Sequence, residues 1–324
     1  MTYENMQKQT LYGSADYKPT WVYNYGDGTP QFREVDIESG HSDKTPVTIV
    51  QLTDLHFNLM NEQDLAEQNP TLMSTYKNRW WLAGGEGKDF ARKVLDYAAE
   101  VGDKTVITGD VMDYLSHGCA EMLHKVIWEN YPDMLVTTGN HEWCQRMEGD
   151  VEEVLSFDER RSRLEQIWKH NLYYTSEIVK DKVMLILLEN GKPGFWDCQI
   201  APLKADLELA RQNGYTVLLF MHIPISINNP DDNSTEPIGQ GSAKDFNEQG
   251  IVGREINNPT PEVYDIIVNS ADVIKGIFTG HFHADYYTEI KAKTKDGEDA
   301  VIPQYILTLP CICKDGSALT ITIK

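Results

Sequence analysis

The chain has 324 residues, 41% of them hydrophobic, and a formal net charge of −21. This content is ample for a sizeable core, and no apolar run is long enough to cross a bilayer. The negative charge argues against long nucleic acids and anionic membranes as partners, because both require a basic protein surface. It does not exclude a small phosphorylated substrate, since a bound cation reverses the local sign of the field.

The sequence starts with MTYENMQKQTLYGSADYKP, which is polar and has no apolar core of the secretory type. A cytoplasmic location is the expectation. We expect residues 1–45 to be an N-terminal extension that packs on a single domain spanning 46–324. Homo-oligomerisation stays open.

Five cysteines occur, and no two have the C-x-x-C spacing. An odd count in a chain of this length does not indicate a disulfide framework. Cys311 and Cys313 form a C-x-C pair, but two thiols without further ligands nearby make a weak metal site. Buried free thiols are the prediction.

Apolar, β-branched runs alternate with helical patterns through most of the chain. Strands are predicted at 46–52, 104–109, 134–139, 182–189, 215–222 and 273–280. Helices are predicted at 88–101, 119–131, 159–170 and 201–213. This alternation indicates an α/β architecture with helices on the faces of a sheet.

The C-terminal tail has a different pattern. Stretches 285–294, 301–309 and 318–324 follow one another without a helix, which predicts antiparallel strands and hence two mixed sheets between helices. Irregular insertions are expected near 57–87 and 224–260, and long loops in compact domains are usually functional or disordered. The second insertion would lie at the rim of a site, as a lid or a dimer contact.

Metal-ligating residue types follow five of the predicted strands. The stretches are TDLH (53–56), GDVMD (109–113), GNHE (139–142), His222 and GHFH (280–283). Ligands of α/β sheets bind beyond the carboxyl ends of the strands. One such ending has a simple alternative, a polar surface loop, but five in series are hard to explain by core packing.

The donor types in these stretches suit a pair of metal ions. In extended backbone His281 and His283 lie on one side, although a surface pair is the alternative. Together with two Asp, one Asn and two further His, these two histidines make seven candidate metal ligands, which is too many for one ion. Two divalent ions of the Mn, Fe, Zn or Co type fit oxygen and imidazole donors. Such a pair shares and acidifies a water, and offsets charge on a phosphoryl group.

The ordered motifs DLH, GDVMD, GNHE, His222 and GHFH resemble those of the calcineurin-like metallophosphoesterase superfamily. The pattern of that superfamily is D-x-H, G-D-x-x, G-N-H-[DE], a lone His and G-H-x-H. The resemblance spans residues 54–283. It implies a four-layer αββα sandwich, with two mixed β-sheets flanked by helices, and the hydrolysis of phosphate esters by a metal-bridging hydroxide.

The resemblance also implies roles for single residues. The implied metal ligands are Asp54, His56 and His283 for the first ion, Asn140, His222 and His281 for the second, and Asp110 for both. His141 would stabilise the phosphoryl charge or protonate the leaving alkoxide, and Asp113 would hydrogen-bond His141. The alternative for Asp113 is a helix cap, and the alternative for Glu142 is a structural role.

Two branches of the superfamily differ from this sequence. Purple acid phosphatases carry a tyrosine three residues after the bridging Asp, where this chain has Asp113, so no tyrosinate–iron chromophore is expected. Serine/threonine phosphatases have arginines beside both motifs, where this chain has Tyr114 and Thr138. The bacterial phosphodiesterase and phosphomonoesterase branches are more similar.

Other residues are candidates for contacts with the substrate. Arg79 and Arg146 could contact phosphate, with a surface position as the alternative. Trp80, Trp81 and Trp143 could stack on a base or sugar, with packing of the loops onto the sheet as the alternative.

Three functions are therefore considered. The first is hydrolysis of small phosphomonoesters or phosphodiesters. The second is a nuclease or nucleotide-pyrophosphate hydrolase on the same scaffold. The third, a non-catalytic interaction scaffold, is disfavoured because every ligand position is filled and His141 is present.

Overall fold

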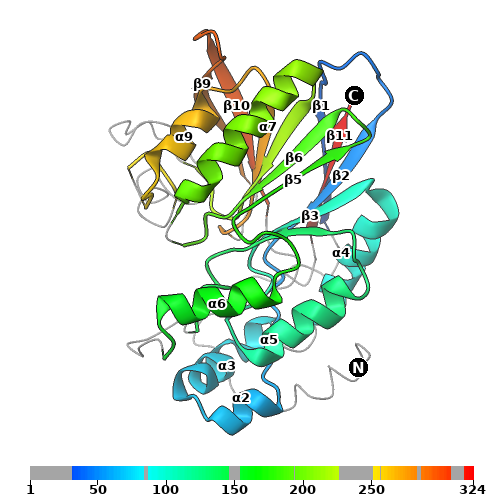
Figure 1. Cartoon of the computed structure of the whole chain (residues 1–324). Coiled ribbons are helices and arrows are strands. Elements are labelled where there is room, and N and C mark those ends of the chain that lie inside the picture. Colours follow the sequence, from blue (N-terminus) through cyan, green and yellow to red (C-terminus); the bar gives the residue numbers. More distant parts are fainter. Residues whose placement is uncertain are drawn as a thin grey trace.

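The computed structural model describes residues 31–83, 87–145, 154–192, 194–225, 251–255, 257–282, 286–307 and 317–324. Within these ranges the chain forms two β-sheets with helices on their outer sides (Figure 1). The predicted division into an extension, 1–45, and a single domain, 46–324, stays a prediction.

The first sheet has five strands in the order β1-β11-β2-β3-β4. Its strands are β1 (Gln31–Ile37), β2 (Val47–Leu52), β3 (Lys104–Thr108), β4 (Leu135–Thr137) and β11 (Ser317–Ile323). Strands β2, β3 and β4 run parallel. Strand β11 is antiparallel to β2 and parallel to the edge strand β1.

The second sheet has six strands in the order β5-β6-β7-β8-β10-β9. Its strands are β5 (Tyr174–Val179), β6 (Val183–Leu188), β7 (Thr216–Phe220), β8 (Ile274–Thr279), β9 (Tyr286–Lys293) and β10 (Asp299–Ile306). The four central strands run parallel, and each edge strand is antiparallel to its neighbour.

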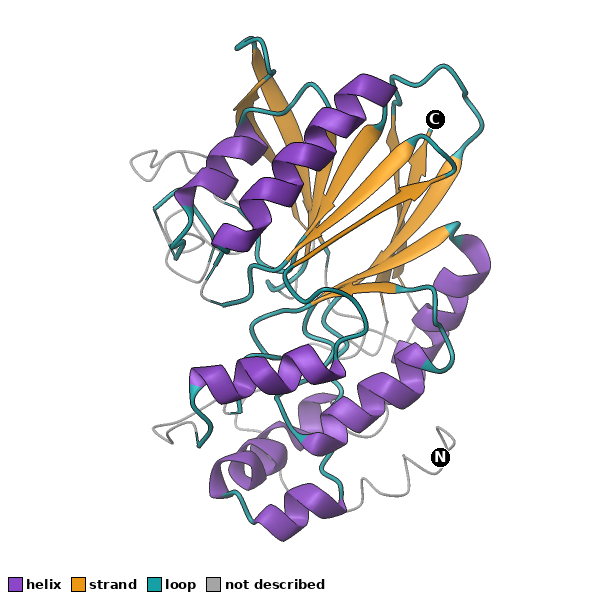
Figure 2. Ribbon diagram, in the orientation of Figure 1, coloured by secondary structure: helices purple, strands orange, loops and turns teal. Residues whose placement is uncertain are grey.

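Helices cover the outer face of each sheet (Figure 2). On the side of the five-stranded sheet lie α2 (Glu62–Glu67), α3 (Pro70–Ala83), α4 (Gly87–Val101), α5 (His117–Met122), a π-helix (Leu123–Trp128) and α6 (Phe157–Ile167). On the side of the six-stranded sheet lie a 3₁₀ turn (Asp197–Gln199), α7 (Ile200–Asn213) and α9 (Pro261–Val268). The predicted α/β class with two mixed sheets between helices is confirmed. No helix in the described ranges is both long enough and apolar enough to span a bilayer.

The central strands are apolar on both faces because the two faces meet different cores. In β2, Ile49 packs between the sheets, whereas Val50 and Leu52 pack against helices. In β7, Leu218 lies between the sheets and Leu219 faces the helices. A side-chain period of two with both faces buried explains why these strands are uninterrupted apolar runs in the sequence.

One expectation about the chain path is wrong and another holds in part. The insertion 57–87 is not irregular, because it contains α2 and α3, and the side chain of Asn69 caps α3 by accepting hydrogen bonds from the amides of Thr71 and Leu72. The tail strands β9 and β10 are antiparallel to each other, as expected, but β10 is parallel to β8 and β11 joins the other sheet. Most of the insertion 224–260 lies outside the described residues.

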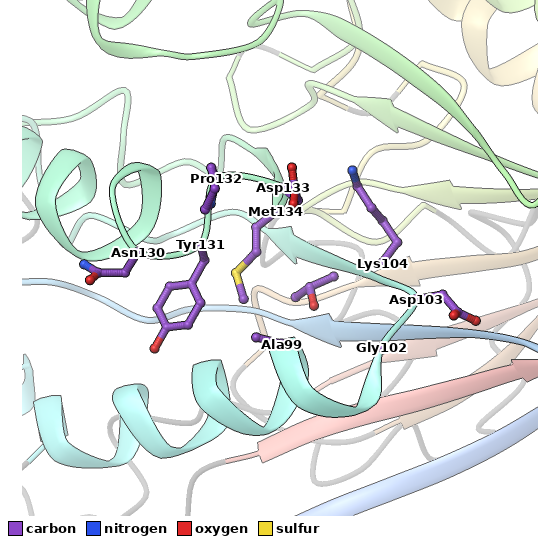
Figure 3. A pocket seen from close by; sticks show the side chains of 10 residues that line it. Ala99, Gly102, Asp103, Lys104, Asn130, Tyr131, Pro132, Asp133 and Met134 are labelled. Carbon is purple, nitrogen blue, oxygen red and sulfur yellow. The ribbon is translucent and has the colours of Figure 1, made fainter.

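A pocket of about 240 Å³ opens at the amino-terminal ends of β3 and β4 (Figure 3). Its lining includes Asp103 and Lys104, which lead into β3, and Asn130, Tyr131 and Met134, which lead towards β4. The motifs predicted to hold metal follow the opposite, carboxyl-terminal ends of the same strands.

Candidate metal centre

The carboxyl ends of β2, β3 and β4 in one sheet meet those of β7 and β8 in the other. The amide of Asp54 donates to the carbonyl of Gly109 (2.9 Å), which joins the loops after β2 and β3. The imidazole of His222, after β7, lies 2.7 Å from the carbonyl oxygen of Thr108. The amide of His281, after β8, donates to the Asp54 carboxylate (3.2 Å). Loops from both sheets therefore converge on one place.

Two glycines of the motifs are required by this close approach. A Cβ atom on Gly139 would lie 2.2 Å from Asp110 Oδ1 and 2.7 Å from His222 Cδ2. A Cβ atom on Gly280 would lie 1.9 Å from Thr53 Oγ1. Only glycine leaves the carboxylates and the imidazole room to approach the backbone.

The backbone of the site is strained at four residues that are not glycine. Asp54, His56, Asp110 and His281 have φ angles of 54°, 45°, 50° and 74°, in the left-handed region. Each such residue costs roughly 1 kcal/mol or more, and such strain persists where surrounding contacts over-determine the backbone. At His56 one of these contacts is the hydrogen bond from its amide to the carbonyl of Asp110 (2.8 Å).

The first group of donor atoms comes from the loops after β2 and β3. Ligand atoms of Asp54, His56 and Asp110 lie within 4.8 Å of one another, and all three residues are buried. Nε2 of His56 is 3.7 Å from Asp54 Oδ1 and 3.9 Å from Asp110 Oδ2. His283, predicted to complete this group, lies outside the described residues.

The second group shares one residue with the first. Ligand atoms of Asp110, His222 and His281 lie within 4.8 Å of one another. Nε2 of His222 is 3.1 Å from Asp110 Oδ2 and 3.1 Å from Asn140 Oδ1. Asp110 therefore stands where a ligand common to two cations would have to stand.

The protonation pattern of the two buried imidazoles fits metal binding. The carbonyl of Thr108 can only accept, so Nδ1 of His222 carries a proton and its Nε2 faces the carboxylates. His56 directs Nδ1 to the Asp113 carboxylate (2.8 Å) and Nε2 to Asp54. A metal-binding histidine usually has its second nitrogen held in this way. The donor set therefore suits divalent cations.

The electrostatic field of the site favours positive charge. Burial alone would lower the pKa of His222, but the charges of Asp110 and Asp54 raise it to about 10. Burial alone would raise the pKa of the Asp110 carboxyl, but His141 and His222 hold it well below its usual value. Ionised carboxylates in a buried place attract a cation strongly.

Asp113 contacts His141 through both its backbone and its side chain. His141 Nδ1 donates to the backbone carbonyl of Asp113 (2.9 Å), and lies 3.3 Å from its Oδ1, the carboxylate contact that the resemblance implies. The carboxylate is nearer to His56 Nδ1 (2.8 Å) and pairs with Arg79. The alternative role as a helix cap is wrong, because the side chain of Ser116 caps α5.

His141 lies beside both groups of donor atoms. Its amide donates to Asp110 Oδ1 (2.9 Å), and its ring Nε2 is 3.7 Å from Asp110 Oδ2. Burial lowers the pKa of His141, with the Asp110 charge acting against burial. Because Nδ1 is engaged, Nε2 is the ring nitrogen that faces the donor cluster.

Glu142 has the structural role that the sequence analysis gave as its alternative. Its buried carboxylate accepts hydrogen bonds from the amides of Asp110 (3.0 Å), Met112 (2.8 Å) and Gly139 (2.7 Å). It thereby ties the loop after β3 to the loop after β4. Burial and the nearby Asp110 charge raise the pKa of Glu142 to about 7.

Arg79 and Trp143 both lie inside the protein. Arg79 is 8% exposed and pairs with Asp113, so its predicted surface alternative is wrong. Trp143 is wholly buried and stacks on Phe157 and Trp196, which confirms the packing alternative for this residue. Arg146 and the side chains of Trp80 and Trp81 lie outside the described residues.

The cysteine prediction is correct only in part. Cys119, Cys144 and Cys198 carry free thiols, as expected. Cys119 is buried, but Cys144 is half-buried and Cys198 is exposed. Cys311 and Cys313 lie outside the described residues.

Similar folds occur among solved structures at low sequence identity. A dimetal phosphatase from Danio rerio is 13% identical, with 82% of this chain and 88% of that chain covered and a TM-score of 0.42. A putative 5′-nucleotidase from Staphylococcus aureus is 12% identical, with 82% and 55% covered and a TM-score of 0.40. Likeness at this level bears on neither activity nor substrate.

Sequence comparison places the chain in a family. No curated protein matches the sequence. The family model described as calcineurin-like phosphoesterase matches residues 47–285, a range that contains all five motifs. The chain therefore belongs to the calcineurin-like phosphoesterase family and is a binuclear metallophosphoesterase.

Proposed function

We propose that this protein hydrolyses small phosphate monoesters or diesters, with two divalent cations of the Mn, Fe, Zn or Co type. The observation that carries the proposal is the position of Asp110. Its carboxylate belongs to both groups of donor atoms, one with Asp54 and His56 and the other with His222 and His281. Carboxylate, amide oxygen and imidazole nitrogen together suit cations of this type.

The ligand assignment uses residues from both sheets. The residues proposed to hold the cations are Asp54, His56 and His283 for one, Asn140, His222 and His281 for the other, and Asp110 for both. When bound, two such cations acidify a water to hydroxide near neutral pH and offset the charge of a phosphoryl group.

The proposed task of His141 is to move a proton. Its Nδ1 proton is committed to the carbonyl of Asp113, so any exchange with the substrate takes place at Nε2. A proton at Nε2 can pass to the oxygen of the leaving alkoxide. The negative charge of a bound phosphate ester favours that proton on a ring that burial otherwise keeps neutral.

The charge of the chain supports a small substrate. A formal net charge of −21 works against binding a long nucleic acid, whose affinity depends on basic side chains that neutralise its phosphates. A small ester needs only the field of the bound cations.

A panel of substrates tests the proposal. Metal-stripped protein is supplied with Mn²⁺, Zn²⁺, Fe²⁺ or Co²⁺ and assayed with p-nitrophenyl phosphate, bis-p-nitrophenyl phosphate, cyclic nucleotides and a nucleotide pyrophosphate. We expect hydrolysis of at least one of the first two, lost on chelation and restored by a cation. The ratio of the two rates assigns monoester or diester preference. Turnover of the pyrophosphate alone, or no turnover with any cation, would contradict the proposal.

A further inference from the structure

Arg79 reaches the metal centre from outside the motifs. It lies on α3, in the insertion between the first two motifs. Its Nε is 3.0 Å from Asp113 Oδ1 and 2.9 Å from Oδ2, and its Nη2 is 2.8 Å from Oδ1. The exposed fractions are 8% for Arg79 and 0% for Asp113, so water does not compete for these contacts.

The same carboxylate holds a predicted metal ligand. Oδ1 of Asp113 lies 2.8 Å from Nδ1 of His56, and Oδ2 accepts from the side-chain Nδ2 of Asn58 (3.3 Å). The opposite nitrogen of the His56 ring faces Asp54 and Asp110. Any rotation of the carboxylate would therefore turn the imidazole away from these two residues.

We propose that Arg79 is a positioning residue of the metal centre. Its guanidinium fixes the plane of the Asp113 carboxylate, and this carboxylate fixes the ring of His56 so that Nε2 points at the cation site. The inference rests on the proposed function, in which His56 is a ligand. A side chain supplied by the insertion would then set the affinity of the centre for its cation.

The contacts of Arg79 favour this role over a contact with substrate phosphate. Nε and Nη2 already lie within 3.0 Å of the carboxylate and hold the guanidinium against it. A planar guanidinium holds a carboxylate through two nitrogens, whereas an ammonium group acts as a point charge and leaves the carboxylate free to rotate. Residues that orient metal ligands typically change metal affinity by 10–100-fold when mutated.

Mn²⁺ binding to the metal-stripped full chain tests the role without using turnover. Titration calorimetry should give a Kd for Arg79→Gln at least about tenfold above that of the wild type. Arg79→Lys should recover part of the affinity but not all of it, because lysine keeps the charge and loses the second contact. An unchanged Kd in either variant overturns the inference. If Arg79→Gln does not fold, Arg79→Lys alone decides.

A matched control separates positioning from general stability. Arg211 on α7 forms a similar pair with Asp272 away from the centre, with Nε–Oδ2 at 2.6 Å and Nη2–Oδ1 at 3.2 Å. We expect Arg211→Gln to lower Tm and to leave the Kd for Mn²⁺ unchanged. An equal loss of Mn²⁺ affinity in Arg211→Gln would mean that stability alone causes the effect, and would overturn the inference.

A double variant tests whether Arg79 acts through Asp113. If it does, the Kd of the double variant is less than about twofold above that of Asp113→Asn alone, because the carboxylate that Arg79 acts on has already been replaced. If the fold-change in Kd of the double variant equals the product of the fold-changes of the two single variants, the inference is overturned. Failure of the proposed function is a different result, because then the wild type itself neither binds Mn²⁺ nor hydrolyses any ester of the panel.

Discussion

The two ends of the parallel strands β3 and β4 carry polar residues with opposite consequences. At the amino-terminal end, around the pocket of Figure 3, two charged groups pair with partners of opposite sign. Lys104 binds Glu177 (2.7 Å), and Asp103 binds Lys180 (2.6 Å). At the carboxyl-terminal end, Asp54 and Asp110 converge with the imidazoles of His56 and His222.

A pocket is therefore a weaker sign of function than a buried cluster of carboxylates and imidazoles. The pocket is open, and its residues Lys104 and Asp103 pair with Glu177 and Lys180 outside its lining. The metal centre packs glycines against carboxylates and holds four residues in left-handed backbone. This backbone strain lowers the free energy of unfolding, so selection for stability alone would not favour it. Buried ionised carboxylates attract a cation strongly, and this attraction distinguishes the two ends.

Asp110→Ala should have the largest effect, because it removes the one carboxylate common to both groups of donor atoms. We expect hydrolysis of the best substrate of the panel to fall to background and bound metal to drop below one ion per chain, by elemental analysis. Asp133→Ala, at the exposed rim of the pocket, should keep both. If Asp110→Ala keeps full metal content and full activity, the two ends of the strands do not differ in their importance for function.

His141→Ala should keep the metal and slow hydrolysis by roughly 10²–10⁴-fold, the usual contribution of a positioned acid or base. The loss should be greater for a substrate with a poor leaving group, which depends on a proton donor. His124→Ala is the control, because its side chain is exposed and pairs with Glu129 at 3.2 Å, outside the donor cluster. If His141→Ala hydrolyses a poor leaving group at the wild-type rate, the proton-transfer role is wrong.

Gly139→Ala should weaken both the fold and the centre, since the added methyl group would lie 2.2 Å from Asp110 Oδ1. We expect a loss of about 1–3 kcal/mol in the free energy of unfolding, typical of overpacking, and weaker Mn²⁺ binding. Gly40→Ala is matched, because nothing lies within 4 Å of its added methyl group. Denaturant unfolding and calorimetry measure both quantities. Equal free energies of unfolding and equal Mn²⁺ affinities in the two variants would show that the close approach at Gly139 affects neither quantity.

The smallest effect is expected in the pocket. Asn130→Ala removes a side chain that caps the preceding helix by donating to the carbonyl of Val126 (3.4 Å). We expect a loss of stability of about 1 kcal/mol or less and no change in kcat/KM or Mn²⁺ affinity. A clear change in kcat/KM would mean that the amino-terminal end of the strands influences catalysis at the carboxyl-terminal end, so that the two ends are not independent.

The sequence was sufficient to predict the strands that carry the centre. Each of these strands is a short apolar run followed at once by Asp, Asn or His, and such endings meet at one edge of parallel sheets. The strands β1 and β5 were missed, because an edge strand with one solvated face lacks the continuous apolar run. The path of β11 into the other sheet depends on pairing with β2, which no local pattern reveals.

The contacts among the site residues were harder to predict. Arg79 and Asp113 are 34 positions apart, and nothing in either local sequence indicates that they pair. The motif suggested that Asp113 serves His141; its carboxylate lies 3.3 Å from His141 Nδ1 but is closer to His56 Nδ1, at 2.8 Å, a contact that the motif did not indicate. Glu142 binds three backbone amides, a role that depends on how two loops approach in space.

The origin of the donor groups in both sheets has a mechanical consequence. Asp54, His56, Asp110 and Asn140 are attached to the five-stranded sheet, and His222 and His281 to the six-stranded sheet. A cation held by residues from both would add a direct link between the two sheets, beyond the packed side chains and the hydrogen bonds such as those of His222 and His281. Demetallation should therefore loosen the whole sandwich, and chelators should make the protein easier to melt as well as inactive.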